Sequence, residues 1–205
     1  MFDLAILAVF IPTFFFVSIT PGMCMTLAMT LGMSIGVRRT MWMMIGELLG
    51  VALVAIAAVL GVASVMLNYP QAFAILKWVG GAYLVFVGII MWRDKAKLDL
   101  NDQQKSKVSR KELFSQGLVT AIANPKGWAF MISLLPPFIN IDYAIAPQLS
   151  ILVTVILVSE FVCMMAYATG GKSLRIFLSR GDNVKFMNAI AGSLMIAVGI
   201  WLAVG

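Results

Sequence analysis

Two carboxylates lie inside stretches of sequence that are otherwise apolar. Glu47 and Glu160 each fall within a hydrophobic run long enough to cross a membrane. An ionisable group inside a bilayer is costly unless it is paired or hydrated, by about 3 kcal/mol on insertion scales. We therefore expect both carboxylates to be functional, either by binding a substrate ammonium or by accepting a coupling proton. The structural alternatives are an ion pair of Glu47 with Arg38 or Arg39 and an ion pair of Glu160 with Lys126.

Two proline breaks form the second feature with chemical meaning. Thr20-Pro21-Gly22 and Asn124-Pro125-Lys126 interrupt hydrophobic segments at matching places in the two halves of the chain. A proline within a spanning helix removes a backbone donor and disturbs the preceding turn. A matched pair of such breaks indicates a transporter's binding site. The alternative is that both prolines are ordinary kinks that improve packing.

The residues beside the prolines predict two new half-helices. The threonine and the asparagine are good N-caps, and proline is favoured at the first helical position. The two N-termini would face each other with free N–H groups and a positive dipole end of about half a charge each, which suits a substrate carboxylate. Gly22 would allow close approach to the backbone. Lys126 would add a full charge, unless it reaches the cytoplasmic interface instead.

Sulfur-bearing residues raise a rival interpretation. Met23-Cys24-Met25 follows the first break, and Cys163-Met164-Met165 lies in a later apolar segment. Thiol and thioether ligands select soft ions such as Cu(I). The chain has 15 methionines spread over most of its apolar segments, and at that density methionine is mainly an apolar filler. We expect no resident metal or cofactor, and no disulfide between the two cysteines.

The elements that must position these groups are membrane spans. The 205 residues are 61% hydrophobic and 12% charged, whereas about a quarter of a soluble chain is charged. Each span needs about 20 apolar residues. Because Met1-Phe2-Asp3 carries no basic residue, we expect the first apolar segment to remain as a span rather than to be a cleaved signal. Six spans are predicted, over residues 4–28, 43–67, 72–92, 114–139, 146–169 and 185–204.

Basic residues gather in three loops on one side of this six-span arrangement. The net charge is +6, and thirteen Lys or Arg residues fall in the loops after spans 1, 3 and 5. This asymmetry predicts a cytoplasmic position for those loops and places both termini outside the cytoplasmic membrane. Anionic lipid headgroups are the expected partner of this face, rather than nucleic acid.

The two halves of the chain repeat each other. Gly81 and Gly88 in the third span match Gly192 and Gly199 in the sixth, each pair seven residues apart and followed by Ile. The two carboxylates occupy the second and fifth spans, and the proline breaks the first and fourth. Because each repeat has three spans, the second copy must enter the membrane from the side opposite to the first. The sequence therefore predicts one all-α transmembrane domain of two inverted three-helix repeats, residues 1–92 and 114–205, joined by a cytoplasmic loop over 93–113.

Small residues predict where helices approach closely. Gly32-x-x-x-Gly36 and Gly46-x-x-x-Gly50 are small-xxx-small pairs, which usually mark helix contacts in membranes. We expect these contacts within the bundle, and a homodimer is the alternative use of the same surfaces.

The order of these motifs resembles the LysE/RhtB family of amino-acid exporters. The resemblance lies in Thr20-Pro21-Gly22, Gly36-Val37-Arg38-Arg39, Trp78–Leu84 and Asn124-Pro125-Lys126, and it continues to Pro136-Pro137-Phe138. The chain departs from the family in having Met23 in place of a second proline, and Pro137 in place of glutamine. The resemblance implies a six-helix inner-membrane exporter of amino acids or related metabolites, driven by the proton gradient.

Three functions therefore remain open at this point. The leading hypothesis is a secondary exporter of a small zwitterion, whose carboxylate would meet the half-helix N-termini and whose ammonium would meet Glu160 or Glu47. The rivals are an exporter of soft metal ions such as cadmium or copper, and a membrane assembly protein that transports nothing. An enzyme is disfavoured, because the chain has no histidine and no phosphate-binding loop or redox pair.

Overall fold

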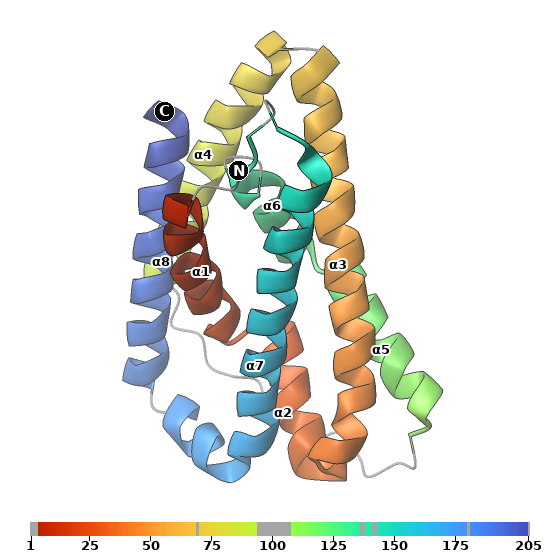
Figure 1. The fold of residues 1–205 in the computed structure, drawn as a ribbon. Coiled ribbons are helices and arrows are strands. Elements are labelled where there is room, and N and C mark those ends of the chain that lie inside the picture. The colour runs from red at the N-terminus through yellow and green to blue at the C-terminus, as the bar shows by residue number, and fades with distance from the viewer. Residues whose placement is uncertain are drawn as a thin grey trace.

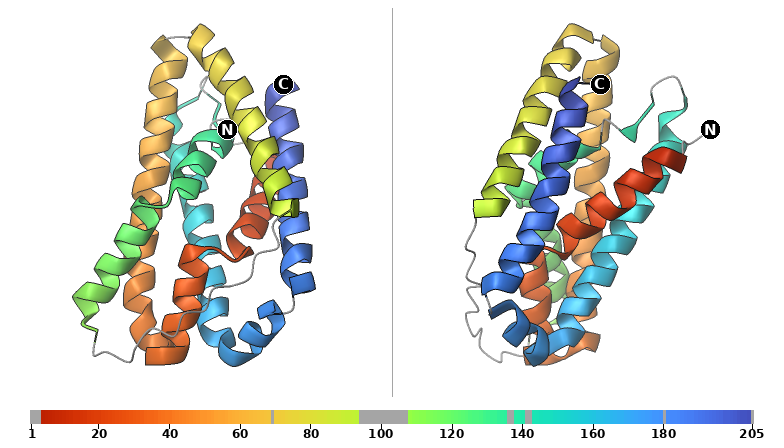
Figure 2. Two further views of the ribbon diagram at one scale, coloured as in Figure 1. Left: turned by 180° about the vertical axis from the view of Figure 1, so that it is seen from behind. Right: turned by 90° about the vertical axis from the view of Figure 1, so that its left-hand side faces the viewer.

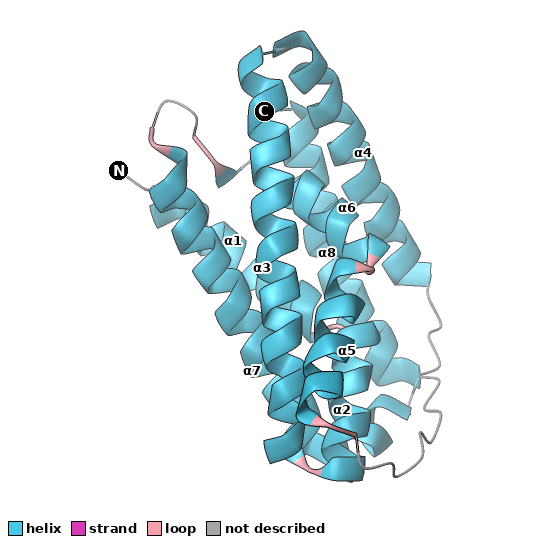
Figure 3. Cartoon of the chain, turned by 90° about the vertical axis from the view of Figure 1, so that its right-hand side faces the viewer, coloured by secondary structure: helices cyan, strands magenta, loops and turns pink. Residues whose placement is uncertain are grey.

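In a computed structural model the chain forms an elongated bundle of helices (Figure 1). The structure describes residues 4–68, 70–93, 108–135, 138–140, 143–179 and 181–204, with some side chains inside the helices left out. All regular elements within these ranges are helical (Figure 3), so the predicted all-α class is confirmed for them. They are α1 (Leu4–Ile19), α2 (Met23–Ile35), α3 (Val37–Asn68), α4 (Pro70–Arg93), α5 (Arg110–Ile122), α6 (Pro125–Leu134), α7 (Ile145–Ser179) and α8 (Gly181–Val204).

Three of the helices are long and apolar enough to cross a membrane as single elements. Within the described residues these stretches are Val37–Gly61, Ile145–Gly171 and Asp182–Ile200. Helices α1 and α2 pass the same test only as a pair, which is bent by 56° at their junction, and they make a fourth span if they cross as one. The other two predicted spans correspond to α4 and to α5 with α6, which do not meet the same test in the part that is described. The membrane-protein class is therefore supported, with three clear spans among the described residues, or four if the bent pair is one span.

The first helix break follows from Pro21, but its local chemistry differs from the prediction. The hydroxyl of Thr20 donates back to the carbonyl of Phe16, 2.8 Å away, and so closes the end of α1. Helix α2 begins at Met23, and its N-cap residue is Gly22, whose extended backbone brings no side-chain cap. The prediction that Thr20 caps a half-helix starting at Pro21 is therefore wrong. A threonine side chain can bond the carbonyl four residues earlier, and here that local acceptor is used.

The second break follows the prediction. Helix α5 ends at Ile122, and α6 begins at Pro125, where the missing N–H of proline costs nothing. The first helical hydrogen bond of α6 joins the N–H of Trp128 to the carbonyl of Asn124 at 3.2 Å. Asn124 therefore occupies the predicted N-cap position.

Glycines let α3 and α5 approach to backbone contact. A Cβ on Gly46 would clash with the carbonyl of Phe114, and one on Gly117 would clash with the carbonyl of Met43. The predicted role of the Gly46–Gly50 pair in helix contact is thus confirmed within the chain. In the other predicted pair only Gly32 makes a helix contact, against the backbone of Ala168. Gly36 instead forms the turn after α2, with φ of 83°.

Helices α4 and α8 lie side by side at one edge of the bundle (Figure 2). The four glycines that repeat in the sequence lie at their contact. A Cβ on Gly88 would fall 2.6 Å from the carbonyl oxygen of Gly192, and a Cβ on Gly192 would fall 2.6 Å from that of Gly88. A Cβ on Gly199 would likewise lie 2.7 Å from the carbonyl oxygen of Gly81.

The basic segments lie at one end of the bundle. Figure 1 shows the α2–α3 corner, the start of α5 and the end of α7 together at the bottom, opposite the α3–α4 turn. Arg39 donates to the carbonyl of Val108 at 2.7 Å, and the guanidinium of Arg110 stacks 5.5 Å from the ring of Trp42. These contacts fix the start of α5 to the α2–α3 corner.

Two buried clusters fill the bundle above and below the helix breaks. One cluster is rich in aromatic and aliphatic residues and includes Phe10, Phe14 and Phe138, toward the end of the bundle where α7 begins. The other, toward the basic end, is rich in methionine and includes Met29, Met43 and Met164. The helix breaks lie between the two clusters.

Candidate functional site

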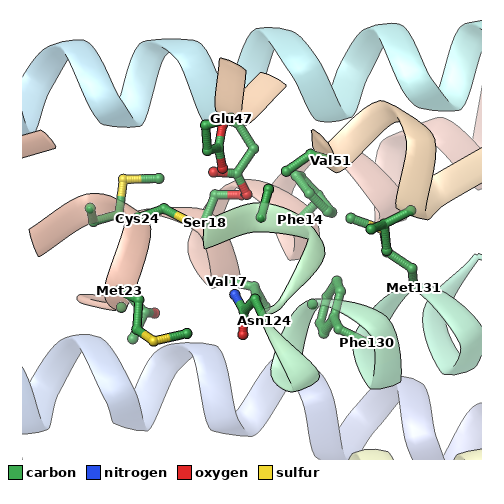
Figure 4. A pocket seen from close by; sticks show the side chains of 17 residues that line it. Phe14, Val17, Ser18, Met23, Cys24, Glu47, Val51, Asn124, Phe130 and Met131 are labelled. Atoms are coloured by element: carbon green, nitrogen blue, oxygen red, sulfur yellow. The ribbon is translucent and has the colours of Figure 1, made fainter. Parts of the chain in front are cut away.

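A single cavity brings together the features that the sequence singled out. Its volume is about 100 Å³, which is room for several water molecules or a small solute. Both helix breaks and both carboxylates contribute to its lining, and Figure 4 shows Cys24, Glu47 and Asn124 around the cavity. The described lining residues that the sequence predicted for the site are Thr20, Gly22, Glu47, Asn124 and Glu160.

Glu160 enters this cavity from α7 and is held by α1. The hydroxyl of Ser18 donates to Oε1 of Glu160 at 2.9 Å. The Ser18 side chain is buried, whereas Glu160 is partly exposed. This bond orients the carboxylate toward the level of the first helix break.

Glu47 enters from α3 and is more enclosed. Its side chain is 1% exposed, and its Oε2 has no hydrogen-bond partner among the described residues. The thiol of Cys24 lies within hydrogen-bonding reach of the carboxyl group, and Glu160 is close enough for electrostatic interaction. The predicted alternative, an ion pair of Glu47 with Arg38 or Arg39, is not found among the described residues. The ion pair present there joins Lys185 and Asp182.

Helix α7 also satisfies the broken end of α1. The hydroxyl of Tyr167 donates to the carbonyl of Ile19 at 2.8 Å, which is one of the carbonyls that the break leaves without a helical donor. Tyr167 lies two turns after Glu160 on the same helix. Both side chains therefore bind the end of α1, Glu160 through Ser18 and Tyr167 through the backbone.

The N-terminus of α2 opens onto the cavity. Gly22, Met23 and Cys24 line it, and the first helical bond runs from the N–H of Thr26 to the carbonyl of Gly22. The preceding N–H groups have no helical acceptor. At the second break Asn124 and Gly127 line the same cavity. The side chains of Pro125 and Lys126 lie outside the described residues, and so does the predicted Lys126–Glu160 pair.

Most of the remaining lining is apolar and was not predicted. Phe14, Val51, Phe130 and Met131 contribute to it, and the rings of Phe14 and Phe130 meet edge to face with centroids 5.9 Å apart. Sequence alone gave little signal for these residues, because apolar side chains are common in every span. Ser18 was not predicted either. Its position in an apolar run, two residues before Thr20, could have indicated a place in the site.

Sulfur groups lie both in the cavity lining, at Met23, Cys24 and Met25, and in the buried core, at Cys163. Among the described residues, no three side chains of His, Cys, Asp or Glu are placed to hold one ion. Met25 and Cys163 are instead packed in the methionine-rich cluster, as expected of apolar fillers.

Comparison with known proteins gives a consistent result. A family model described as LysE type translocator matches residues 15–205. A homoserine/homoserine lactone efflux protein of Salmonella typhimurium is 30% identical over 91% of this chain and 90% of its own length. An uncharacterized membrane protein of Vibrio cholerae is 27% identical over the same shares, and a leucine efflux protein of Enterobacter is 24% identical over 92% and 90%. No solved structure shows a significant match.

Proposed function

The chain belongs to the family of LysE type translocators, and from this premise we propose that it is a secondary exporter of amino acids or closely related small metabolites. One observation carries the proposal: both helix breaks and both intramembrane carboxylates line one cavity. The efflux relatives named above act on homoserine or its lactone and on leucine, which supports a substrate with an amino-acid backbone.

The cavity offers complementary groups for a zwitterion. The substrate carboxylate binds at the free N–H groups of α2, and at those of α6, where helix dipoles favour negative charge. The ammonium binds at Glu160, which is already oriented by Ser18. Thr20, Pro21, Gly22, Asn124, Pro125 and Lys126 form the carboxylate side of this site.

The second carboxyl group couples transport to protons. Glu47 and Glu160 interact electrostatically, and two negative charges in one apolar cavity repel strongly without a cation between them. A proton and a substrate ammonium therefore compete for the pair. Arrival of a proton from outside releases the ammonium, and loss of that proton inside restores the site. Such competition makes the transporter an antiporter that exchanges protons for substrate.

The contact of α4 with α8 supports an inverted repeat. In the sequence repeat, Gly81 corresponds to Gly192 and Gly88 corresponds to Gly199. In the structure Gly88 faces Gly192 and Gly81 approaches Gly199, so each contact joins two glycines that do not correspond. Reciprocal contacts of this kind are what a two-fold axis produces. We propose that α1–α4 and α5–α8 are the two repeats, each completing three spans, with the helix breaks of both meeting at the cavity.

The charge distribution supports an orientation in the bacterial inner membrane. The end with the α2–α3 corner and the start of α5 faces the cytoplasm, near anionic lipid headgroups, and both termini lie outside.

A direct experiment measures exchange of labelled amino acids in proteoliposomes that contain the purified protein. Exchange of at least one standard amino acid is expected, with export accelerated by an opposing pH gradient. Double substitution of Glu47 and Glu160 by Gln provides the inactive control. Absence of exchange for the whole set would remove the proposed function.

The two rival functions make different predictions. A soft-metal exporter would confer cadmium or copper resistance that is lost when Cys24 and Cys163 are both replaced by Ser. It is not favoured, because among the described residues no three His, Cys, Asp or Glu side chains are placed to hold one ion. An assembly protein would show no flux, and Pro21→Ala and Glu160→Gln would then alter only stability.

A further inference from the structure

The cavity has two layers, one polar and one apolar. Ser18 and Glu47 lie in the polar layer, at the level of the first break. Phe14 precedes Ser18 by four residues on α1, and Val51 follows Glu47 by four residues on α3. Four residues make about one helical turn, roughly 6 Å along the axis. Figure 4 shows the same division, with Phe14 and Val51 on the side away from Cys24.

Helix α6 extends the division to the second half of the chain. Asn124 and Gly127 line the cavity at the start of α6, and Phe130 and Met131 line it about one turn further along. Three helices thus run from polar to apolar residues in the same direction, toward the end of the bundle where α7 begins. Phe14, Phe130 and Met131 belong to one buried cluster and Val51 packs against it, so these residues form one apolar wall.

The apolar layer is closed at its far end by aromatic rings. Phe14 meets Phe130 with ring centroids 5.9 Å apart, Phe10 lies 5.7 Å from Phe14, and Phe138 lies 4.9 Å from Phe10. All four side chains are almost fully buried. Packed rings of this kind limit how far a ligand can extend.

We propose that the layer formed by Phe14, Val51, Phe130 and Met131 is the side-chain subsite of the transported amino acid, and that it selects uncharged aliphatic side chains of limited length. This inference rests on the proposed function. With the amino and carboxylate groups held in the polar layer, the side chain extends toward this wall. A basic or acidic side chain finds no polar partner among its four residues, and an unpaired charge in apolar surroundings is strongly disfavoured.

The expected selectivity has a definite order. A missing or extra methylene in an apolar pocket changes kcat/KM by about 10- to 200-fold, and an added hydroxyl is rejected by only about 100-fold. Leucine should therefore be exchanged best, homoserine up to about 100-fold less efficiently, and lysine and glutamate at least 100-fold less efficiently.

The first test is competition among these four amino acids in proteoliposomes. Comparable exchange of lysine or glutamate and leucine, with transport still abolished by the double carboxylate substitution, would overturn the subsite while leaving the proposed function intact. Failure of all amino acids would instead remove the proposed function, and the inference with it.

The second test changes the wall itself. Val51→Phe fills the apolar layer, so the leucine-to-alanine ratio of kcat/KM should fall at least tenfold. This ratio does not depend on how much protein folds. Leu53→Phe adds the same ring on the exposed face of α3, where the side chain is 49% exposed, and should leave the ratio unchanged. An unaltered ratio in Val51→Phe would show that the side chain binds elsewhere.

Discussion

At the residue scale, Glu47 and Glu160 differ in their surroundings although they share one cavity. Glu160 is partly exposed and accepts a hydrogen bond from Ser18. Glu47 is enclosed, and its Oε2 has no donor among the described residues. Burying a polar atom without a hydrogen-bond partner costs free energy. On this difference we propose Glu47 as the proton carrier and Glu160 as the site of the substrate ammonium.

Replacing Glu47 by Gln tests the proton assignment. The amide keeps the size of the side chain but cannot release a proton, so export driven by a pH gradient should be lost while substrate exchange at equal pH persists. Both rates are measured in the same proteoliposomes with labelled substrate. Continued acceleration by the pH gradient would show that Glu47 does not carry the coupling proton.

Glu160→Gln tests the ammonium assignment. Loss of a hydrogen bond to a charged group costs about 1.5–3 kcal/mol, so KM for exchange should rise by roughly 10- to 150-fold. Glu112→Gln is a matched control, because Glu112 is exposed at the start of α5 and glutamine can also complete its capping box with Ser109. An unchanged KM in Glu160→Gln would move the ammonium site elsewhere.

At the element scale, α7 holds the broken end of α1. Tyr167→Phe removes the donor to the carbonyl of Ile19 and leaves a partly buried acceptor unpaired, at a cost of about 1–3 kcal/mol. The melting temperature in detergent should fall by several degrees, and amide exchange should increase at the end of α1. Tyr143→Phe is the control, because the Tyr143 side chain is 55% exposed. Equal effects of the two substitutions would argue against a specific role of this bond.

The crossing of α3 and α5 depends on a missing side chain. Gly46→Ala would place a Cβ against the carbonyl of Phe114, so the helices must separate and the protein should lose more than about 1 kcal/mol of stability. Gly61→Ala on the same helix meets open space and should be neutral or slightly stabilising, because alanine favours helix by about 1 kcal/mol. Thermal unfolding of both variants measures the difference, and similar melting temperatures would contradict the close approach.

These elements also show what the sequence could and could not predict. Gly46 and Gly50 were predictable as a helix contact, because little else favours glycine within an apolar helix. Thr20 was misassigned, because its hydroxyl had two local partners in reach and sequence does not decide between them. The apolar wall was not predictable, since Phe14 and Val51 belong to residue types that fill every span. Its location became visible only once α1 and α3 were packed together.

At the scale of the whole molecule, the cavity lies between two unlike clusters. The cluster on the side where α7 begins contains stacked aromatic rings, and the cluster toward the basic end is rich in methionine. Methionine side chains repack easily because they are unbranched and flexible. The methionine-rich cluster is therefore the better candidate for the part that opens during transport, whereas the aromatic cluster closes the other side of the cavity.

The orientation of the molecule is open to direct measurement. After Cys24 and Cys163 are replaced by Ser, single cysteines are introduced by Lys111→Cys at the start of α5 and by Tyr143→Cys before α7, both at exposed positions. The positive-inside rule places the first in the cytoplasm and the second outside. A membrane-impermeant maleimide should therefore label the Tyr143 variant in intact cells and the Lys111 variant only in inverted vesicles. The opposite pattern would reverse the orientation, and labelling of both from one side would rule out the six-span inverted arrangement.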